Sequence, residues 1–255
     1  MKMVVLMKQT FDTEEKIVVK QGNIVEDGVK FVINPYDEYA VEEAVKLRDE
    51  FGGSVTLVSL GPSRAAEALR TALAMGADEA VLISDDRIPD DEYAVSKVLY
   101  TYLSKENPDL ILGGNFSVDR GSGQVAIRLA NMLSIPHTAS ITKLTINGTT
   151  AEVHRDAEGD LEILTLPLPA LFTAQQGLNE PRYPSLPGIM KAKKKPFKTY
   201  TLEDLDLTED EVKPATKQTE LTLPPERSAG QILIGEPAEA VSELVSLLRT
   251  KSKVI

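Results

Sequence analysis

A glycine-containing loop near the middle of the chain carries residue types that bind phosphate. Gly121, Gly123 and Ala126 match the pattern G-x-G-x-x-A, and the stretch QVAIRLANML that follows has helical periodicity. Free N–H groups and the dipole at a helix N-terminus favour an anion, and glycine allows close backbone approach. Ser122 can add a hydroxyl donor, and Asp119 can contact a ribose or simply fix the loop. The loop therefore indicates a nucleotide site.

The same loop is also compatible with a helix start that binds nothing. The residues NFSVDR separate the glycines from the apolar stretch DLILGG. In the dinucleotide-binding fingerprint the glycines follow the first strand of the fold directly. Spacing alone leaves both interpretations open.

A second polar turn precedes an earlier helical stretch. In Asn34-Pro35-Tyr36-Asp37, the simplest role of Asn34 or Asp37 is to cap the helix that follows. Tyr36 is the residue of this turn that can face a ring system. The two readings, a capped helix and a ligand contact, both remain open at this point.

The composition excludes several kinds of chemistry. The chain has no cysteine, which excludes disulfides, thiolate nucleophiles and cysteine-ligated clusters. Its two histidines, His137 and His154, lie apart in the sequence, so a zinc site or a histidine-based triad is not expected. No nucleophile–base pair or acid–base pair is evident. We therefore expect no metal and no catalytic residue, and a binding protein rather than a self-contained catalyst.

Length and charge are those of an ordinary globular protein. The chain has 255 residues, 42% of them hydrophobic and 26% charged, with a formal net charge of −11. This charge argues against binding to nucleic acid or to an anionic membrane. The opening MKMVVLMK is too short for a signal peptide, and no apolar run approaches a membrane span. We expect a cytoplasmic chain without membrane insertion.

The first half of the chain alternates between predicted strands and predicted helices, which would position these residues. Apolar strands are predicted at 3–7, 54–61, 79–84 and 109–114, and amphipathic helices at 36–51, 64–77, 92–106 and 121–133. Apolar strands alternating with such helices indicate an α/β fold with a mostly parallel, doubly wound sheet. Ligands bind such sheets at the carboxyl ends of the strands. Those ends bring Leu6, Leu60 and the glycine loop together.

The pattern changes after Pro136. β-Branched runs joined by Asn147-Gly148 and Glu158-Gly159 predict hairpins, which would add antiparallel strands at one edge of the sheet. From about residue 201 the chain becomes acidic and contains prolines, and it ends in an amphipathic stretch from 237. We therefore expect an α/β domain over 1–200 and a C-terminal arm with a helix over 201–255.

The stretch NEPRYPSLPGIMKAKKKP, residues 179–196, combines features that rarely occur together. Pro181, Pro184 and Pro187 stiffen it and make helix or strand improbable. It nevertheless carries Leu186, Ile189 and Met190 next to a lysine cluster in an acidic protein. An exposed contact surface for a partner is one interpretation. The other is that Leu186 packs internally and the lysines form a solvated patch.

Several segments together resemble the beta subunit of electron transfer flavoproteins over essentially the whole chain. They are VLMKQTFD, INPYDEYAVEEAVKLRDE, LRTALAMGADEAVLI, DLILGGNFSVDRGSGQV and NEPRYPSLPGIMKAKKKP. The resemblance implies an adenine nucleotide alpha-hydrolase-like fold and a heterodimer with an alpha subunit that carries most of the FAD. The beta subunit would hold AMP, and the C-terminal arm would dock on alpha. Electrons would pass from acyl-CoA dehydrogenases of fatty acid β-oxidation and related flavoenzymes to a quinone oxidoreductase or another acceptor.

The resemblance also implies two sets of site residues. Tyr36 would lie toward the flavin, and Leu186 would be the anchor of a docking loop that spans 179–196. The implied AMP contacts are Leu6, Asn34, Pro35, Tyr36, Asp37, Leu60, Asp119, Ser122, Gly123, Gln124 and Val125. The implied docking residues are Arg182, Tyr183, Leu186, Ile189, Met190, Lys191 and Lys194.

Two alternatives remain open. The loop 115–121 departs from the K-Q-A-I-D-D-D of many relatives, and Arg120 adds a charge that matters for a pyrophosphate. Electron-bifurcating members of the family bind a second FAD in place of AMP and take hydride from NADH. A module that binds adenine nucleotides without redox work would use the same fold, although it would have no use for the arm or the docking loop.

Overall fold

The computed structural model describes residues 1–225 and 229–255, which group by contacts into two units. The first unit comprises 1–17 and 25–219, and the second comprises 18–24 and 220–255. In the described part of the chain, no helix combines the length and apolarity needed to cross a membrane.

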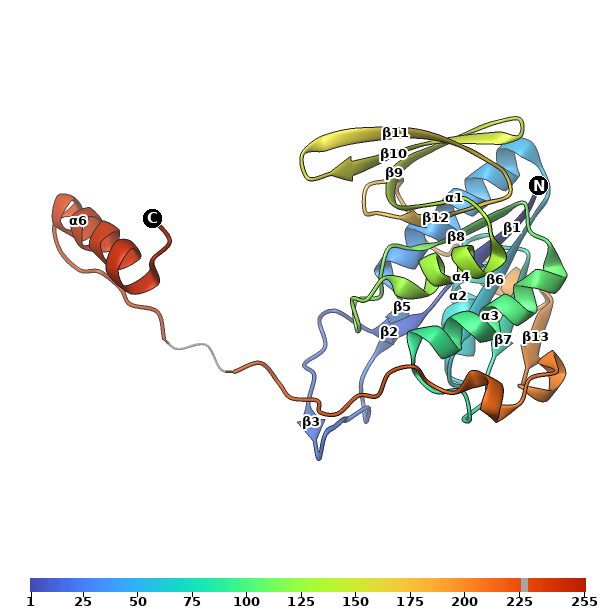
Figure 1. The fold of residues 1–255 in the computed structure, drawn as a ribbon, viewed down its shortest axis with the longest axis horizontal. Helices are drawn as coiled ribbons and strands as arrows, with labels where there is room; N and C mark the ends of the chain where they lie inside the picture. The colour runs from blue at the N-terminus through green and yellow to red at the C-terminus, as the bar shows by residue number, and fades with distance from the viewer. Residues whose placement is uncertain (226–228) are drawn as a thin grey trace. The chain divides into compact units, whose positions relative to one another are not determined.

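The first unit contains the sheet and its covering helices (Figure 1). Its strands are β1 (Lys2–Leu6), β2 (Gln9–Phe11), β5 (Phe31–Ile33), β6 (Ser54–Leu60), β7 (Glu79–Ile83), β8 (Leu110–Gly114), β9 (His137–Asn147), β10 (Thr150–Ala157), β11 (Asp160–Pro167), β12 (Ala170–Ala174) and β13 (Phe197–Tyr200). Its helices are α1 (Pro35–Phe51), α2 (Ala65–Met75), α3 (Glu92–Glu106), α4 (Gln124–Leu133) and α5 (Leu186–Ala192), with the short 3-10 turns η1 (Glu203–Leu205) and η2 (Glu209–Val212).

The central sheet of the described residues has nine strands in the order β11-β10-β9-β12-β8-β1-β6-β7-β13. Neighbouring strands are parallel throughout the part of this order that runs from β9 to β13. The pairs β9–β10 and β10–β11 are antiparallel and lie at one edge. The predicted fold class, a mostly parallel α/β sheet with antiparallel edge strands, is therefore confirmed.

In the central parallel strands, alternating side chains pack into two separate cores, one on each face of the sheet. In β1, Met3 and Val5 pack with α1 and α2, whereas Val4 and Leu6 pack with α3 and α4. The helices therefore cover both faces, as a parallel sheet requires (Figure 1). Burying one such aliphatic side chain contributes roughly 1.5–3 kcal/mol.

The order of the strands places a switch point beside β1. The chain runs from β1 through β6 to β7 on one side, and then crosses to β8 and β12 on the other side. The crossover helices accordingly change from one face of the sheet to the other. Ligands of open α/β sheets bind where this change of direction occurs, beyond the carboxyl ends of the strands.

The segment that follows β13 remains part of the first unit. Leu202, Leu205 and Val212 are buried in the core under α3. The buried Asp91 carboxylate accepts hydrogen bonds from the backbone N–H of Ala215 at 3.2 Å and of Thr216 at 2.9 Å. The first unit thus extends to Thr219, beyond the expected start of the arm at 201.

A helix forms where the sequence predicted neither helix nor strand. Residues Leu186–Ala192 are α5, so the prediction that the prolines make a helix improbable is wrong here. Pro187 lies in the first turn, where its missing N–H would have no helical partner. The Ser185 side chain caps the helix by accepting from the N–H of Gly188 at 3.1 Å.

The second unit groups a small hairpin with the C-terminal part of the chain. The hairpin joins β3 (Val19–Lys20) to β4 (Asn23–Ile24) through Gln21 and Gly22, both at positive φ. The C-terminal helix is α6 (Pro237–Leu247), followed by the π-helical turn η3 (Leu248–Ser252). No residue of α6, which lies in the described range 229–255, is buried.

Candidate nucleotide site and docking segment

Polar residues converge at the ends of β1 and β8, next to the switch point. The side chain of Asn34 is buried and bonds to the loop after β8: its Nδ2 donates to the Phe116 carbonyl at 2.9 Å, and its Oδ1 accepts from the Val118 N–H at 3.1 Å. The Asn34 N–H donates to the Lys8 carbonyl at 2.9 Å. Asn34 therefore joins the chain after β1 to the loop after β8.

The capping role considered for Asn34 and Asp37 is wrong. Asn34 occupies the N-cap position of α1, but its side chain makes no capping hydrogen bond. Asp37 lies inside the first turn, and its carboxylate bonds outside the helix. It accepts from the backbone N–H of Lys8 at 2.7 Å and of Gly114 at 3.0 Å, and from Asn34 Nδ2 at 3.0 Å.

Burial dominates the electrostatics of Asp37. Desolvation raises the pKa of this carboxyl to about 7, against the opposing effect of its three hydrogen bonds. The packing around it is equally tight, because a Cβ at Gly114 would collide with Asp37 Oδ1 and the Tyr36 side chain. We call Lys8, Asn34, Asp37, Gly114, Phe116 and Val118 the strand-end network.

An aromatic pair and an ion pair border this network. The rings of Tyr36 and Phe116 lie 4.3 Å apart between centroids, tilted by 43°. The Lys8 ammonium donates to the Asp119 carboxylate at 2.7 Å. Burial is the largest single effect and would raise the pKa of Asp119, but the hydrogen bonds to this carboxylate and the positive charge of Lys8 together outweigh burial and lower that pKa. Asp119 is thereby held at the edge of the candidate site.

The start of α4 is exposed and free of acidic side chains in its first turn. Gly123 precedes it with φ 61°, and a Cβ there would lie 2.9 Å from the Asn115 carbonyl oxygen. The side chains of Ser122 and Gln124 are exposed. The N–H groups of a first helical turn lack intrahelical partners. Backbone donors are therefore available there for an anion.

Other predicted residues occupy different surroundings. The side chains of Leu6 and Leu60 pack with the core under α3 and α4, so only the adjoining backbone borders the strand ends. Arg120 pairs with the Asp90 and Glu92 carboxylates, the latter at 3.9 Å. Within residues 1–225 and 229–255, no group of three His, Asp or Glu side chains suits a metal ion.

Sequence reasoning missed Lys8, Phe116 and Val118, and it placed Gly114 only at the end of a strand. Lys8 and Gly114 contribute through backbone N–H groups, whose partner Asp37 lies 29 and 77 residues away in the chain. The only signal in the sequence is position: Gly114 is the last residue of a buried strand, and Lys8 follows one. Such positions border the ligand side of a parallel sheet.

Residues 179–196 present an apolar surface to solvent. Tyr183 and Leu186 are 94% and 81% exposed, and Ile189 and Met190 are also exposed. Lys191 and Lys194 lie exposed in and directly after α5. Leu186 is thus not packed internally, and the sequence interpretation in which it would be is wrong. We refer to residues 179–196 as the docking segment, after the role that the sequence resemblance implies.

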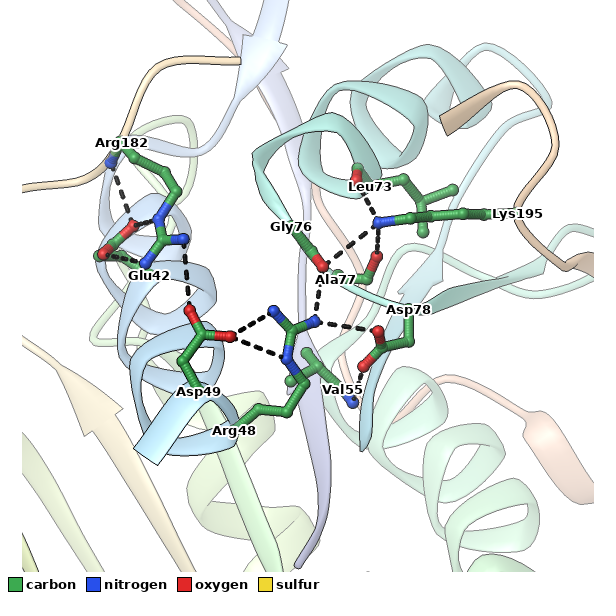
Figure 2. A network of polar contacts seen from close by, with 10 residues as sticks. All are labelled: Glu42, Arg48, Asp49, Val55, Leu73, Gly76, Ala77, Asp78, Arg182 and Lys195. Atoms are coloured by element: carbon green, nitrogen blue, oxygen red, sulfur yellow. Dashed lines mark hydrogen bonds and ion pairs between the residues drawn. The ribbon is translucent and has the colours of Figure 1, made fainter. Parts of the chain in front are cut away.

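The beginning of the docking segment is attached to α1 by two buried carboxylates. Arg182 bonds Glu42 with both Nε, at 2.7 Å, and Nη2, at 3.0 Å (Figure 2). Asn179 Nδ2 donates to Glu43 at 2.9 Å and to the Tyr39 carbonyl at 3.0 Å. The end of the segment is attached to α2: Lys195 Nζ donates to the carbonyls of Leu73 at 2.9 Å, of Gly76 at 3.3 Å and of Ala77.

Comparison with known proteins places these features in one family. Residues 21–205 match the model of the electron transfer flavoprotein domain. The chain is 59% identical to electron transfer flavoprotein subunit beta of Bacillus subtilis, and the match covers 100% of both proteins. It is 40% identical to electron transfer flavoprotein subunit beta of Syntrophomonas wolfei, over 100% of this chain and 98% of that protein. It is 35% identical to subunit CarD of the caffeyl-CoA reductase-Etf complex of Acetobacterium woodii, over 98% of this chain and 99% of that protein. The chain therefore belongs to the electron transfer flavoprotein family as a beta subunit, the partner of an alpha subunit in a flavoprotein of electron transport.

Proposed function

We propose that this beta subunit holds AMP at the carboxyl ends of β1, β6 and β8. The observation that carries the proposal is the strand-end network, in which Asn34 and Asp37 fix the loop that leads to the exposed start of α4. The phosphate would bind the backbone N–H groups from Ser122 to Val125. Asn34 and Asp37 are buried, so their part is to shape the site.

The alpha subunit would carry the redox-active FAD, and this chain would help to hold it. Tyr36 supports that arrangement, because it is only partly buried and its ring contacts Phe116 beside the candidate nucleotide site. An electron carrier requires no proton-transfer residue of its own in this chain. The structure offers an architecture for binding and positioning, and the chemistry would belong to the flavin.

The docking segment would contact acyl-CoA dehydrogenases and related flavoenzymes. Leu186 would insert into an apolar pocket of the partner, with Tyr183, Ile189 and Met190 around it. Lys191 and Lys194 would steer acidic partners, which raises association rates more than affinity. The electrons would continue to a quinone oxidoreductase or another acceptor, and the C-terminal arm would dock on the alpha subunit.

A second candidate has FAD in place of AMP, with NADH as the electron donor. The observation that favours it is the similarity to CarD, a subunit of a caffeyl-CoA reductase-Etf complex. A pyrophosphate would need more positive charge near α4, and Arg120 is already paired with Asp90. We therefore place AMP first.

The composition of the purified heterodimer tests both candidates. Mass spectrometry of the released small molecules, together with the flavin absorbance, should give one FAD and one AMP per heterodimer. Two FAD and no AMP would support the second candidate. A colourless heterodimer that releases an adenine nucleotide would refute an electron carrier and leave a nucleotide-binding module.

A further inference from the structure

The two ends of the docking segment are connected to each other through a continuous polar network on α1 and α2. In addition to its bonds to Glu42, Arg182 forms an ion pair with Asp49, in which Arg182 Nη1 lies 3.6 Å from Asp49 Oδ2. Asp49 pairs with Arg48 at 2.7 Å. Arg48 Nη1 in turn donates to the Gly76 carbonyl at 2.7 Å, and the same carbonyl accepts from Lys195. Figure 2 shows this chain of contacts from Arg182 to Lys195.

Further contacts attach the middle and the end of the segment to α2. Arg70 Nη1 donates to the Ala192 carbonyl at 2.8 Å, and its guanidinium lies over the Phe197 ring at 4.5 Å. A Cβ at Gly188 would lie 2.5 Å from the Ala74 carbonyl oxygen, so α5 rests directly on the end of α2. Only the side chains on the outer surface of the segment remain free to contact another protein.

The geometry of Arg182 distinguishes it from the lysines of the segment. Its guanidinium binds both oxygens of Glu42, whose side chain is 6% exposed, and its backbone N–H donates to the same carboxylate at 3.1 Å. A planar fork with this bidentate geometry cannot be replaced by an ammonium group. The charge of Arg182 is therefore paired with a buried carboxylate and contributes little to steering a partner.

We propose that Glu42, Arg48, Asp49, Arg182 and Lys195 form a clamp that holds the docking segment in its binding conformation before a partner arrives. This inference rests on the proposed docking function. Arg182 acts as a positioning residue, through Leu186, and does not itself contact the partner. A contact surface that is already ordered loses less conformational entropy on binding.

Hydrogen exchange in the heterodimer tests the clamp without any partner. In Arg182→Gln, the amides of α5 should exchange faster by at least about tenfold, as expected when a charge-assisted hydrogen bond is lost. Arg155→Gln is the matched control, because Arg155 Nε bonds Glu162 at the same 2.7 Å and its side chain is 36% exposed, against 40% for Arg182. Unchanged exchange in Arg182→Gln would overturn the clamp, even if docking itself proved correct.

Kinetics then test what the clamp does. We expect Arg182→Gln to raise the KM for an acyl-CoA dehydrogenase by about tenfold, with FAD content and kcat unchanged. Arg182→Lys keeps the charge but not the fork, so it should behave like Arg182→Gln. Full rescue by lysine would show that charge steering is the role of Arg182, and the clamp would be refuted.

A double-mutant cycle separates this inference from the proposed function. If Arg182 acts through Leu186, Arg182→Gln should have little further effect in a Leu186→Ala background. Fully additive effects would contradict a role exerted through Leu186. If Leu186→Ala alone has no effect, the docking function fails, and hydrogen exchange still decides whether the clamp exists.

Discussion

The Asp37 carboxylate accepts a hydrogen bond from the backbone N–H of Gly114 at 3.0 Å. This contact joins the first turn of α1 to the last residue of β8. Since Asp37 also accepts from the N–H of Lys8, one buried side chain connects the ends of two neighbouring strands. The loops after both strands are fixed by this contact, and the candidate nucleotide site lies between them.

Replacing Gly114 by alanine should disrupt this contact. The new Cβ would collide with the Asp37 carboxylate and lie 2.7 Å from Tyr36 Cβ. We expect a loss of about 1–3 kcal/mol in the free energy of unfolding, measured by denaturant titration of the heterodimer, and a lower AMP content. Gly61→Ala is the control, because its Cβ would meet only Ala65 Cβ at 3.9 Å. Equal stability of the two variants would contradict this account.

The buried carboxyl of Asp37 should make stability depend on pH. Burial raises the pKa from 3.8 to about 7, so the folded state binds the proton more tightly than the unfolded state does. The contribution of Asp37 is then fully present below about pH 4 and is lost as pH rises through about 7. We expect wild type to lose stability relative to Asp37→Asn over this range.

Thermal unfolding of both heterodimers from pH 4 to pH 8 measures that difference. Because both proteins share every other titratable group, the difference between their melting temperatures isolates Asp37. A difference that stays constant across the range would show that Asp37 does not titrate there.

Leu186→Ala should slow reduction of the heterodimer by an acyl-CoA dehydrogenase. Loss of a buried aliphatic anchor is worth roughly 1.5–3 kcal/mol, or about tenfold to a hundredfold in kcat/KM. The FAD content should not change, since Leu186 is an exposed residue of the docking segment. Leu161→Ala, which removes a 56% exposed leucine from β11, serves as the control. Unaltered stopped-flow kinetics in Leu186→Ala would count against docking through this residue.

Gly123→Ala should reduce the AMP retained by the purified heterodimer. Alanine at φ 61° is strained, and its Cβ would lie 2.9 Å from the Asn115 carbonyl oxygen, which displaces the loop before α4. Gly121→Ala has a similar backbone strain, at φ 70°, but its Cβ would meet nothing within 4 Å. Nucleotide released per heterodimer should therefore fall more in Gly123→Ala. The same loss in both variants would assign the effect to the backbone alone.

Local patterns were sufficient to predict the alternation of strands and helices. Helical spacing in 92–106 and the apolar run before Gly114 depend only on neighbours in sequence, and both appear as α3 and β8. The helix α5 was missed because Pro187 and Gly188 disfavour helices in general. Its stability comes from a cap by Ser185 and from close contact with α2, which sequence spacing does not reveal.

The candidate site was predictable only in part. The order of elements placed Leu6, Leu60 and the glycine loop near one another, and only the family resemblance added Asn34 and Asp37 to that site. The partners of Asp37 were not predicted, because backbone N–H groups carry no sequence signal. The core side chains Leu202, Leu205 and Val212 were assigned to the arm, because they are widely spaced in an acidic stretch.

The helix α6 exposes Val241 and Leu244, and none of its described residues is buried. A cell that made this polypeptide in excess of the alpha subunit would therefore accumulate molecules with an exposed apolar helix, which is open to proteolysis and to non-specific association. If the C-terminal arm docks on the alpha subunit, as proposed, equal synthesis of the two subunits would avoid that burden.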